Sequence, residues 1–218
     1  MRRARDGVEV RRRGGRGQPA IFIRRSRRPT PAAAGEPADL ERFTPERLKQ
    51  QGANLATRLR IARHPGPTFP LWDFARRSKL TVEAVNADLT EGAALGQSVS
   101  TAAEWLLDNG YIVQRHIGDV LDNLSKGFYE VLPVLEDGGL AGRPRIYEIA
   151  QEFVAHADSD VYERDIVEFL LGFQEINPLT IAELWAMPLM IRLALVENLG
   201  YLAVQIRQRQ QQHERADF

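Results

Sequence analysis

Two types of side chain that bind metal ions lie close together in the second half of the chain, at His156, Asp158 and Asp160. An imidazole and two carboxylates could form part of a divalent-metal site. The same segment joins two expected helices, where aspartate is typical of turns and helix caps. A metal site needs further ligands, and the sequence offers none at a suitable spacing. We therefore favour the turn and expect no metal at this position.

Acidic residues gather again just downstream, at Glu163, Asp165 and Glu168. Glycoside hydrolases use two carboxylates, one on each side of the bond that they cleave. These three acids fall in the first turns of one expected helix, which does not place two of them on opposite sides of a sugar. The chain also has no cysteine, no G-x-S-x-G and no glycine-rich phosphate motif. We expect no catalytic residue and no cofactor.

Arg143, Arg145 and Tyr147 surround the expected start of a helix at Pro144. Backbone N–H groups at a helix start can bind phosphate, and arginines would add positive charge for a phosphate or a sugar. The alternative, which we favour, is a turn in contact with solvent. Arg145 and Tyr147 are therefore kept as candidates for structural or partner contacts.

Two charged residues, Arg192 and Glu197, interrupt an apolar run from Leu184 to Leu202. Charges at mid-span are costly in lipid, so the run predicts a buried helix of a soluble domain rather than a membrane span. Five residues correspond to about 140° around a helix, so the two side chains point to different faces. We expect both to be partly buried, each with its own partner, in a structural ion pair or, for the arginine, bridging carbonyl groups, rather than in a ligand site.

The three tryptophans, Trp72, Trp105 and Trp185, could stack on sugar rings. Each has apolar neighbours in the sequence, which is typical of tryptophans that pack in a core. We prefer core packing for all three.

Helix start signals indicate how these residues are positioned. Thr44 and Pro45 are typical of the cap and first position of a helix. A second helix is expected from Leu80 to Leu95, capped by Thr81. Three capping boxes predict three further helix starts, at residues 101–104, 160–163 and 180–183.

The remaining expected elements lie around these helices. A loop is expected over residues 128–143, which contain three glycines and a proline, and a helix is expected from Pro144. Pro188 predicts a kink in the last helix. The chain becomes polar after Leu202, so we expect this helix end to leave the core. No alternation typical of a strand follows residue 40.

Charge divides the chain unevenly. Residues 1–37 contain eleven arginines and three acidic residues, and the rest of the chain carries the balancing negative charge, because the total is zero. The Arg, Gly and Pro content of residues 1–40 predicts a disordered basic arm. We therefore expect a helical domain over 41–213 with a frayed end at 214–218, and an all-α fold of about six helices in an irregular bundle.

Four stretches carry a family resemblance, covering together roughly residues 45–210: AEWLLDNGYIVQRHI (103–117), GFYEVLPVL (127–135), AGRPRIYEIAQEFVAHADSDV (141–161) and NPLTIAELWAMPLMIRLALVENL (177–199). In this order they resemble the N-terminal region of cyclic β-1,2-glucan synthases, which are very large bacterial inner-membrane proteins. The resemblance implies a helical region that precedes a membrane-embedded glycosyltransferase, which uses UDP-glucose, and a later phosphorylase-like domain. Neither the transferase motifs nor the phosphorylase motifs have a counterpart here.

The resemblance assigns no catalytic residue, but it marks eight positions as candidates for structural or partner contacts: Arg145, Tyr147, His156, Asp158, Glu183, Trp185, Arg192 and Glu197. It implies a non-catalytic accessory domain of a glucan synthase-like protein, at the cytoplasmic face of the inner membrane. The expected partner is the remainder of such a synthase, in cis or in trans, together with an anionic membrane surface. The alternative is a stand-alone module whose basic arm binds anionic membranes or nucleic acid, of which nucleic acid is the less expected. A chain that stops at Phe218 fits either a fragment or a free-standing domain.

Overall fold

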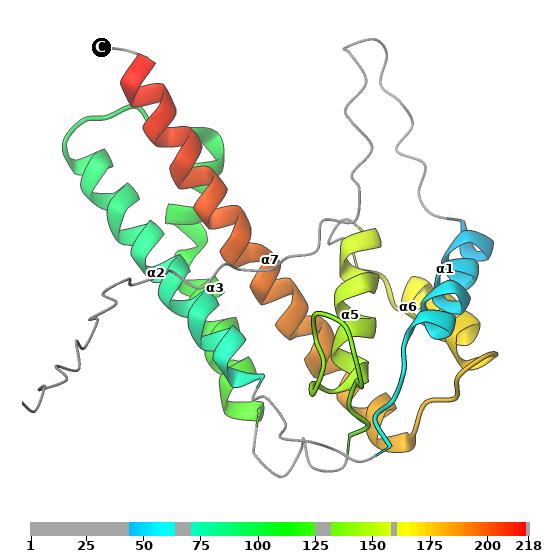
Figure 1. The fold of residues 1–218 in the computed structure, drawn as a ribbon. Helices are drawn as coiled ribbons and strands as arrows, with labels where there is room; N and C mark the ends of the chain where they lie inside the picture. Colours follow the sequence, from blue (N-terminus) through cyan, green and yellow to red (C-terminus); the bar gives the residue numbers. More distant parts are fainter. Residues whose placement is uncertain (1–43, 64–70, 125–131, 158–160, 217–218) are drawn as a thin grey trace, which may run out of the picture. The chain divides into compact units, whose positions relative to one another are not determined.

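The computed structural model describes residues 44–63, 71–124, 132–157 and 161–216. These residues form six helices and no sheet, which confirms the expected all-α fold. The helices are α1 (Pro45–Arg58), α2 (Trp72–Ala94), α3 (Thr101–Asn123), α5 (Arg145–His156), α6 (Glu163–Gln174) and α7 (Ile181–Ala216), shown in Figure 1. The expected arm, residues 1–40, lies outside the described residues, and the proposed domain boundaries stay predictions.

Helix α1 begins as expected and packs against α6. The Thr44 side chain accepts a hydrogen bond from the backbone N–H of Arg47, and Pro45 is the first helical residue. The two helices approach through glycines. A methyl group added to Gly52 of α1 would clash with the backbone of α6, and one added to Gly172 of α6 would clash with the carbonyl group of Lys49. Small residues at both positions therefore allow the backbones to lie in direct contact.

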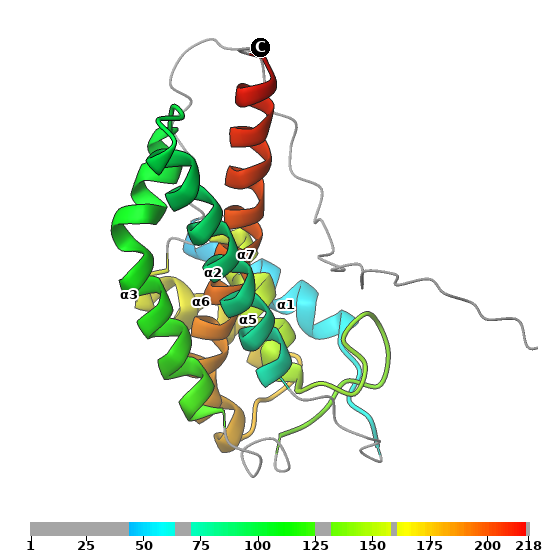
Figure 2. The ribbon, with the colours of Figure 1, turned by 90° about the vertical axis from the view of Figure 1, so that its left-hand side faces the viewer.

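Helices α2 and α3 both run beside α7, as the two views in Figures 1 and 2 show. The expected start of α2 at Leu80 is wrong. The helix begins at Trp72, and Thr81 lies in its interior rather than at a cap. The reason is that its buried residues recur at helical spacing from Ala75 to Leu89, so packing favours helix across the whole segment.

Helix α3 starts one residue away from its predicted cap. The Ser100 hydroxyl, not that of Thr101, accepts the hydrogen bond from the backbone N–H of Ala103. The helix is unbroken through Gly110, whose missing side chain leaves room for the Asn86 side chain of α2. The glycine therefore serves a close contact between helices rather than a bend.

The segment between α3 and α5 is a loop in its described part, residues 132–144, as expected. It is held by single β-bridges that pair Ile61 with Leu135 and Val134 with Pro144. The backbone N–H of Arg145 also donates to the carbonyl oxygen of Pro133 at 2.8 Å. The start of α5 is therefore pinned to this loop.

The capping box that opens α7 is confirmed. The Thr180 hydroxyl accepts from the N–H of Glu183 at 3.2 Å, and the Glu183 carboxylate accepts from the N–H of Thr180 at 2.8 Å. The box expected at Asp160 is not tested, because Asp160 lies outside the described residues, and α6 begins at Glu163 without a side-chain cap. Helix α7 continues through Pro188, where a kink stays a prediction.

The polar end of α7 does not leave the fold as expected. The Gln210 side chain is buried and donates a hydrogen bond to the carbonyl oxygen of Ser98. Its amide oxygen accepts from the backbone N–H of Ser100 at 3.3 Å. The last turns of α7 are therefore tied to the connection between α2 and α3.

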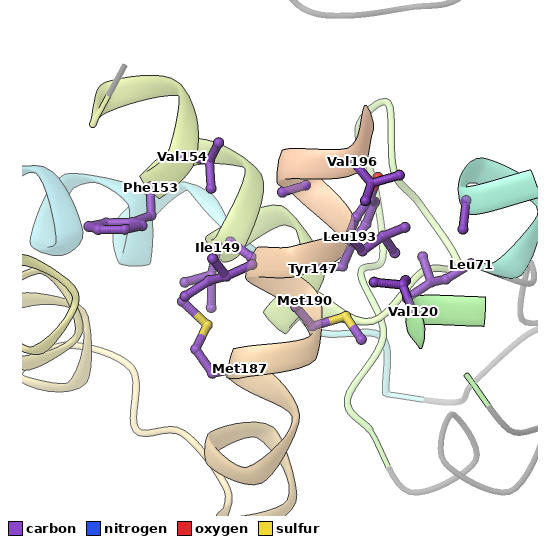
Figure 3. Close-up of a cluster of buried hydrophobic side chains, with 14 of the residues drawn as sticks. Leu71, Val120, Tyr147, Ile149, Phe153, Val154, Met187, Met190, Leu193 and Val196 are labelled. Carbon is purple, nitrogen blue, oxygen red and sulfur yellow. The ribbon is translucent and has the colours of Figure 1, made fainter. Parts of the chain in front are cut away.

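The core is centred on α7. Figure 3 shows Met187, Met190 and Leu193 of α7 among buried side chains from α5 and other elements. Burial of each such side chain stabilises the fold by roughly 1.5–3 kcal/mol. Within the described residues, one helix, over Ile181–Gln212, is long and apolar enough to cross a membrane, by length and composition only. In the fold, 39% of its most apolar window is buried.

Candidate functional site

The guanidinium group of Arg145 and the carboxylate of Glu183 bind each other in the core. Nε of Arg145 donates to one carboxylate oxygen at 2.8 Å, and a terminal nitrogen donates to the other at 2.7 Å. The two residues are 1% and 0% exposed. Arg145 is the first residue of α5 and Glu183 lies in the first turn of α7, so this ion pair joins the starts of the two helices.

Further partners engage both groups. Arg145 also donates to the side-chain oxygen of Asn177 at 2.7 Å and to the carbonyl oxygen of Pro178 at 3.1 Å. Glu183 accepts from both the N–H and the hydroxyl of Thr180. Buried charges need such partners, because an unpaired charge in the core costs several kcal/mol. The preferred interpretation of Arg145 as part of a solvated turn is therefore wrong, and its hydrogen-bonding groups are directed at protein rather than at a phosphate.

A second polar cluster joins α5 and α7 further along both helices. The Tyr147 hydroxyl donates to the Glu197 carboxylate, and the amide nitrogen of Gln151 lies 2.7 Å from both the hydroxyl and the carboxylate. The ring of Tyr147 stacks on Phe74 of α2, with the ring centroids 5.6 Å apart. Tyr147 therefore touches two helices besides its own.

Burial governs the titration of this second cluster. Burial raises the pKa of Glu197 above its ordinary value, against the opposing effect of hydrogen bonds from Tyr147 and Gln151. Burial, followed by the charge of Glu197, raises the pKa of the Tyr147 hydroxyl well above its ordinary value. In this contact the Tyr147 hydroxyl is the donor and the Glu197 carboxylate is the acceptor.

Two arginines lie over the ring of Phe74. The guanidinium carbon of Arg143 is 4.0 Å from the ring centroid, and that of Arg77 is 4.8 Å away. Each contact of this kind contributes roughly 0.5–1 kcal/mol at an exposed position. Both arginines favour the charged form of Glu197, because they place positive charge near it.

The sequence was compared with those of known proteins. Over 170 residues, 75% of this chain, the sequence is 37% identical to the cyclic beta-(1,2)-glucan synthase NdvB of Rhizobium meliloti (strain 1021). This chain is a relative of a cyclic β-1,2-glucan synthase. The resemblance seen in the sequence is thereby confirmed. The chain spans only 6% of the length of that synthase. No model of a known protein family matches the chain.

The prediction for Glu197 holds for its burial but not for the kind of partner, which is a hydroxyl and an amide rather than a cation. The prediction for Arg192 is wrong. Glu197 is partly buried and has partners of its own, whereas Arg192 is exposed. The separation of about 140° is the reason, since it places one side chain towards α5 and the other towards solvent. The apolar neighbours of these two residues in the sequence did not reveal which face of α7 was buried.

Core packing of the tryptophans is also wrong where the structure tests it most clearly. Trp185 is 81% exposed and Trp105 is 54% exposed, and Trp72 is 36% exposed. Trp185 lies on the exposed face of α7, and Trp105 lies on the exposed face of α3. A residue's apolar character thus predicted its helix but not its orientation.

The histidine near the end of α5 makes local contacts. Nδ1 of His156 lies 2.6 Å from the carbonyl oxygen of Glu152 and 3.6 Å from its carboxylate. The described residues contain no group of three or more side chains suited to hold a metal. Asp158 lies outside the described residues, so the turn expected there stays a prediction.

Sequence reasoning missed Gln151 and Asn177, which complete the two clusters. Gln151 follows Tyr147 by four residues, the spacing that places two side chains on one helix face, and this signal could have identified it. Asn177 carries no comparable signal, because its partner Arg145 is 32 residues away. Together the two clusters fix α5 against α7 at two points.

Proposed function

We propose that this chain is a non-catalytic helical accessory domain of a cyclic β-1,2-glucan synthase-like protein. The family resemblance implies that the parent activity is glucosyl transfer from UDP-glucose. The similarity to the Rhizobium meliloti synthase supports the relationship, and the matched stretch is a small part of that protein. A helical region of this size in a much larger synthase serves packing and positioning.

One observation carries the non-catalytic role: the buried polar and charged groups of α5 and α7 face one another. Arg145 and Glu183 are bound to each other and to neighbouring protein groups, and Glu197 is held by Tyr147 and Gln151. A catalytic carboxylate or arginine must reach a substrate, whereas these reach neighbouring helices. The arrangement supports a scaffold that holds α5 and α7 in a set relation.

The proposed partner is the remainder of a synthase, in cis or in trans, and the proposed location is the cytoplasmic face of the inner membrane. The apolar helix over Ile181–Gln212 is compatible with a position next to a membrane. The alternative, binding through the basic arm, depends on residues outside the described ones, and the comparison with the synthase does not favour it.

Co-expression tests this function. The full 218-residue chain would be expressed with the Rhizobium meliloti synthase from which the matched 170 residues are deleted, and the chain would be recovered from detergent-solubilised membranes. We expect the two to co-purify, and we expect the purified chain alone to transfer no glucose from UDP-glucose. Arg145→Ala breaks the buried ion pair and destabilises the fold, so this variant is the control for loss of co-purification through loss of folding. Turnover by the chain alone, or absence of co-purification by a folded chain, would contradict the proposal.

A further inference from the structure

Within the described part of the chain, one face of α7 stays largely exposed over six turns. We define the α7 stripe as the residues that lie within an arc of about 100° at 100° per residue: Ile181, Leu184, Trp185, Pro188, Arg192, Leu195, Leu199 and Leu202. Seven of the eight are apolar. Six are exposed, whereas Leu195 and Leu199 are half-buried and pack in part against the core. The stripe is about 32 Å long, because each residue adds about 1.5 Å.

The packed faces of α7 are elsewhere. Helices α2, α3 and α5 contact α7, and its buried residues, such as Met190 and Leu193, lie on the opposite side from the stripe. A row of largely exposed apolar residues is typical of an interaction surface, whereas single exposed ones are ordinary. The stripe therefore requires an explanation that scattered residues such as Leu80 do not.

Arg192 decides between lipid and protein as the occupant. It lies about 15 Å from either end of the stripe, and a charged side chain at such a depth costs roughly 2.5–3.5 kcal/mol in hydrocarbon. Helices that lie in the membrane interface also have a charged polar face opposite the apolar one. The opposite face of α7 is instead the core of this fold. The stripe is thus poorly suited to lipid.

A second copy of the chain is equally poorly suited. Two stripes paired about a twofold axis near their middle would bring the two Arg192 side chains together, and like charges across an interface are unfavourable. The area is also small. A strip about 32 Å long and 10 Å wide offers about 300 Å², against about 800 Å² for each partner in a standard interface.

A small interface is effective when its two sides are held near each other, because the effective concentration is then high. The related synthase is many times longer than this chain and offers such a partner within one assembly. We propose that the α7 stripe docks an apolar helix of the synthase that carries one carboxylate opposite Arg192. This inference rests on the proposed function and names the surface and the chemistry of the contact. The carboxylate would satisfy the charge of Arg192 once water is excluded.

Photo-crosslinking tests the contact, because it captures weak interfaces covalently. The full chain, with a photo-reactive amino acid at position 185, would be co-expressed with the deleted Rhizobium meliloti synthase and irradiated in membranes. We expect an adduct with an apolar synthase segment that contains Asp or Glu. Arg192→Glu should lower the yield about fivefold or more, because it replaces attraction by repulsion. The same reporter at position 105 on α3 should give no such adduct, and Arg76→Glu on α2 is the matched charge control.

The outcomes separate the surface from the function. An adduct with lipid, or between two copies of the chain, would overturn the inference, as would a yield that Arg192→Glu leaves unchanged. A chain that co-purifies with the synthase but forms no adduct at position 185 would also overturn it, while the proposed function would stand. No co-purification at all would contradict both. Circular dichroism of each variant checks that the helices are retained.

Discussion

Arg145 and Glu183, which are 38 residues apart in the sequence, face each other through two hydrogen bonds of 2.8 and 2.7 Å in the core. We predict that Arg145→Ala destabilises the chain by about 3–5 kcal/mol, because it leaves the Glu183 carboxylate buried without its countercharge. Urea unfolding followed by circular dichroism measures the change. The double variant Arg145→Met, Glu183→Gln should lose clearly less unfolding free energy than the sum of the losses of the single variants Arg145→Met and Glu183→Gln. Additive losses would mean that the two groups act independently.

The Tyr147 hydroxyl is the second group to test. Tyr147→Phe removes the hydrogen bond to Glu197, and we expect a loss of about 1–3 kcal/mol, because a largely buried carboxyl group loses its donor. Thermal unfolding at pH 7 provides the measurement. Tyr111→Phe is the matched control, since Tyr111 is exposed on α3 and should change stability by no more than about 0.5 kcal/mol. Equal effects at both positions would contradict a role for the Tyr147–Glu197 contact.

The raised pKa of Glu197 predicts a pH dependence. Its charged form is disfavoured in the fold, so the folded state binds a proton more readily than the unfolded state. The stability associated with this proton is present below the ordinary pKa of 4.5 and is lost as the pH rises through the raised folded pKa. Glu197→Gln keeps an oxygen acceptor for Tyr147 and does not titrate. At pH 7 the variant should be at least as stable as the wild type.

The comparison across pH gives the sign. As the pH falls from 7 towards 4.5, the wild type should gain stability relative to Glu197→Gln, measured as the difference between their unfolding temperatures. A difference that stays constant, or that moves in favour of glutamine at low pH, would show that the Glu197 pKa is not raised in the folded chain.

At Gly172, close packing and helix propensity have opposite effects on the stability change caused by an alanine substitution. Gly172→Ala should destabilise by about 1–3 kcal/mol, because its methyl group would meet the backbone of α1. Gly118→Ala on α3 is the control, since nothing lies near the position of its added methyl group. That variant should gain about 0.5–1 kcal/mol from helix propensity. A rise in unfolding temperature for both variants would contradict the close contact between α1 and α6.

Local signals in the sequence predicted the fold class and several helix starts. The capping box at Thr180 and Glu183 was predictable because both partners lie within one turn. The pairing of Glu183 with Arg145 was not, because it depends on how two distant helices meet. The exposure of Arg192 and Trp185 was missed for a related reason. An apolar run indicates a helix, but the elements that pack against the helix decide which of its faces is buried.

The start of α2 illustrates a competition between local and tertiary preferences. Thr81 favours a helix cap, yet it lies within a helix whose buried side chains begin at Ala75. Burial of several apolar residues, at roughly 1.5–3 kcal/mol each, outweighs a cap contribution of about 1 kcal/mol. The boundary was therefore set by packing that the sequence does not display locally.

The attachment of Gln210 has a mechanical consequence for α7. Its side chain is hydrogen-bonded to the connection between α2 and α3, while Glu183 is bound by Arg145 near the other end of the same helix. These two anchors are 27 residues apart, a lever of about 40 Å. A tilt of about 5° around one anchor would displace the other by about 3–4 Å. Any load applied at the first turns of α7 must therefore be resisted, or relayed, at the far tip of the α2–α3 hairpin.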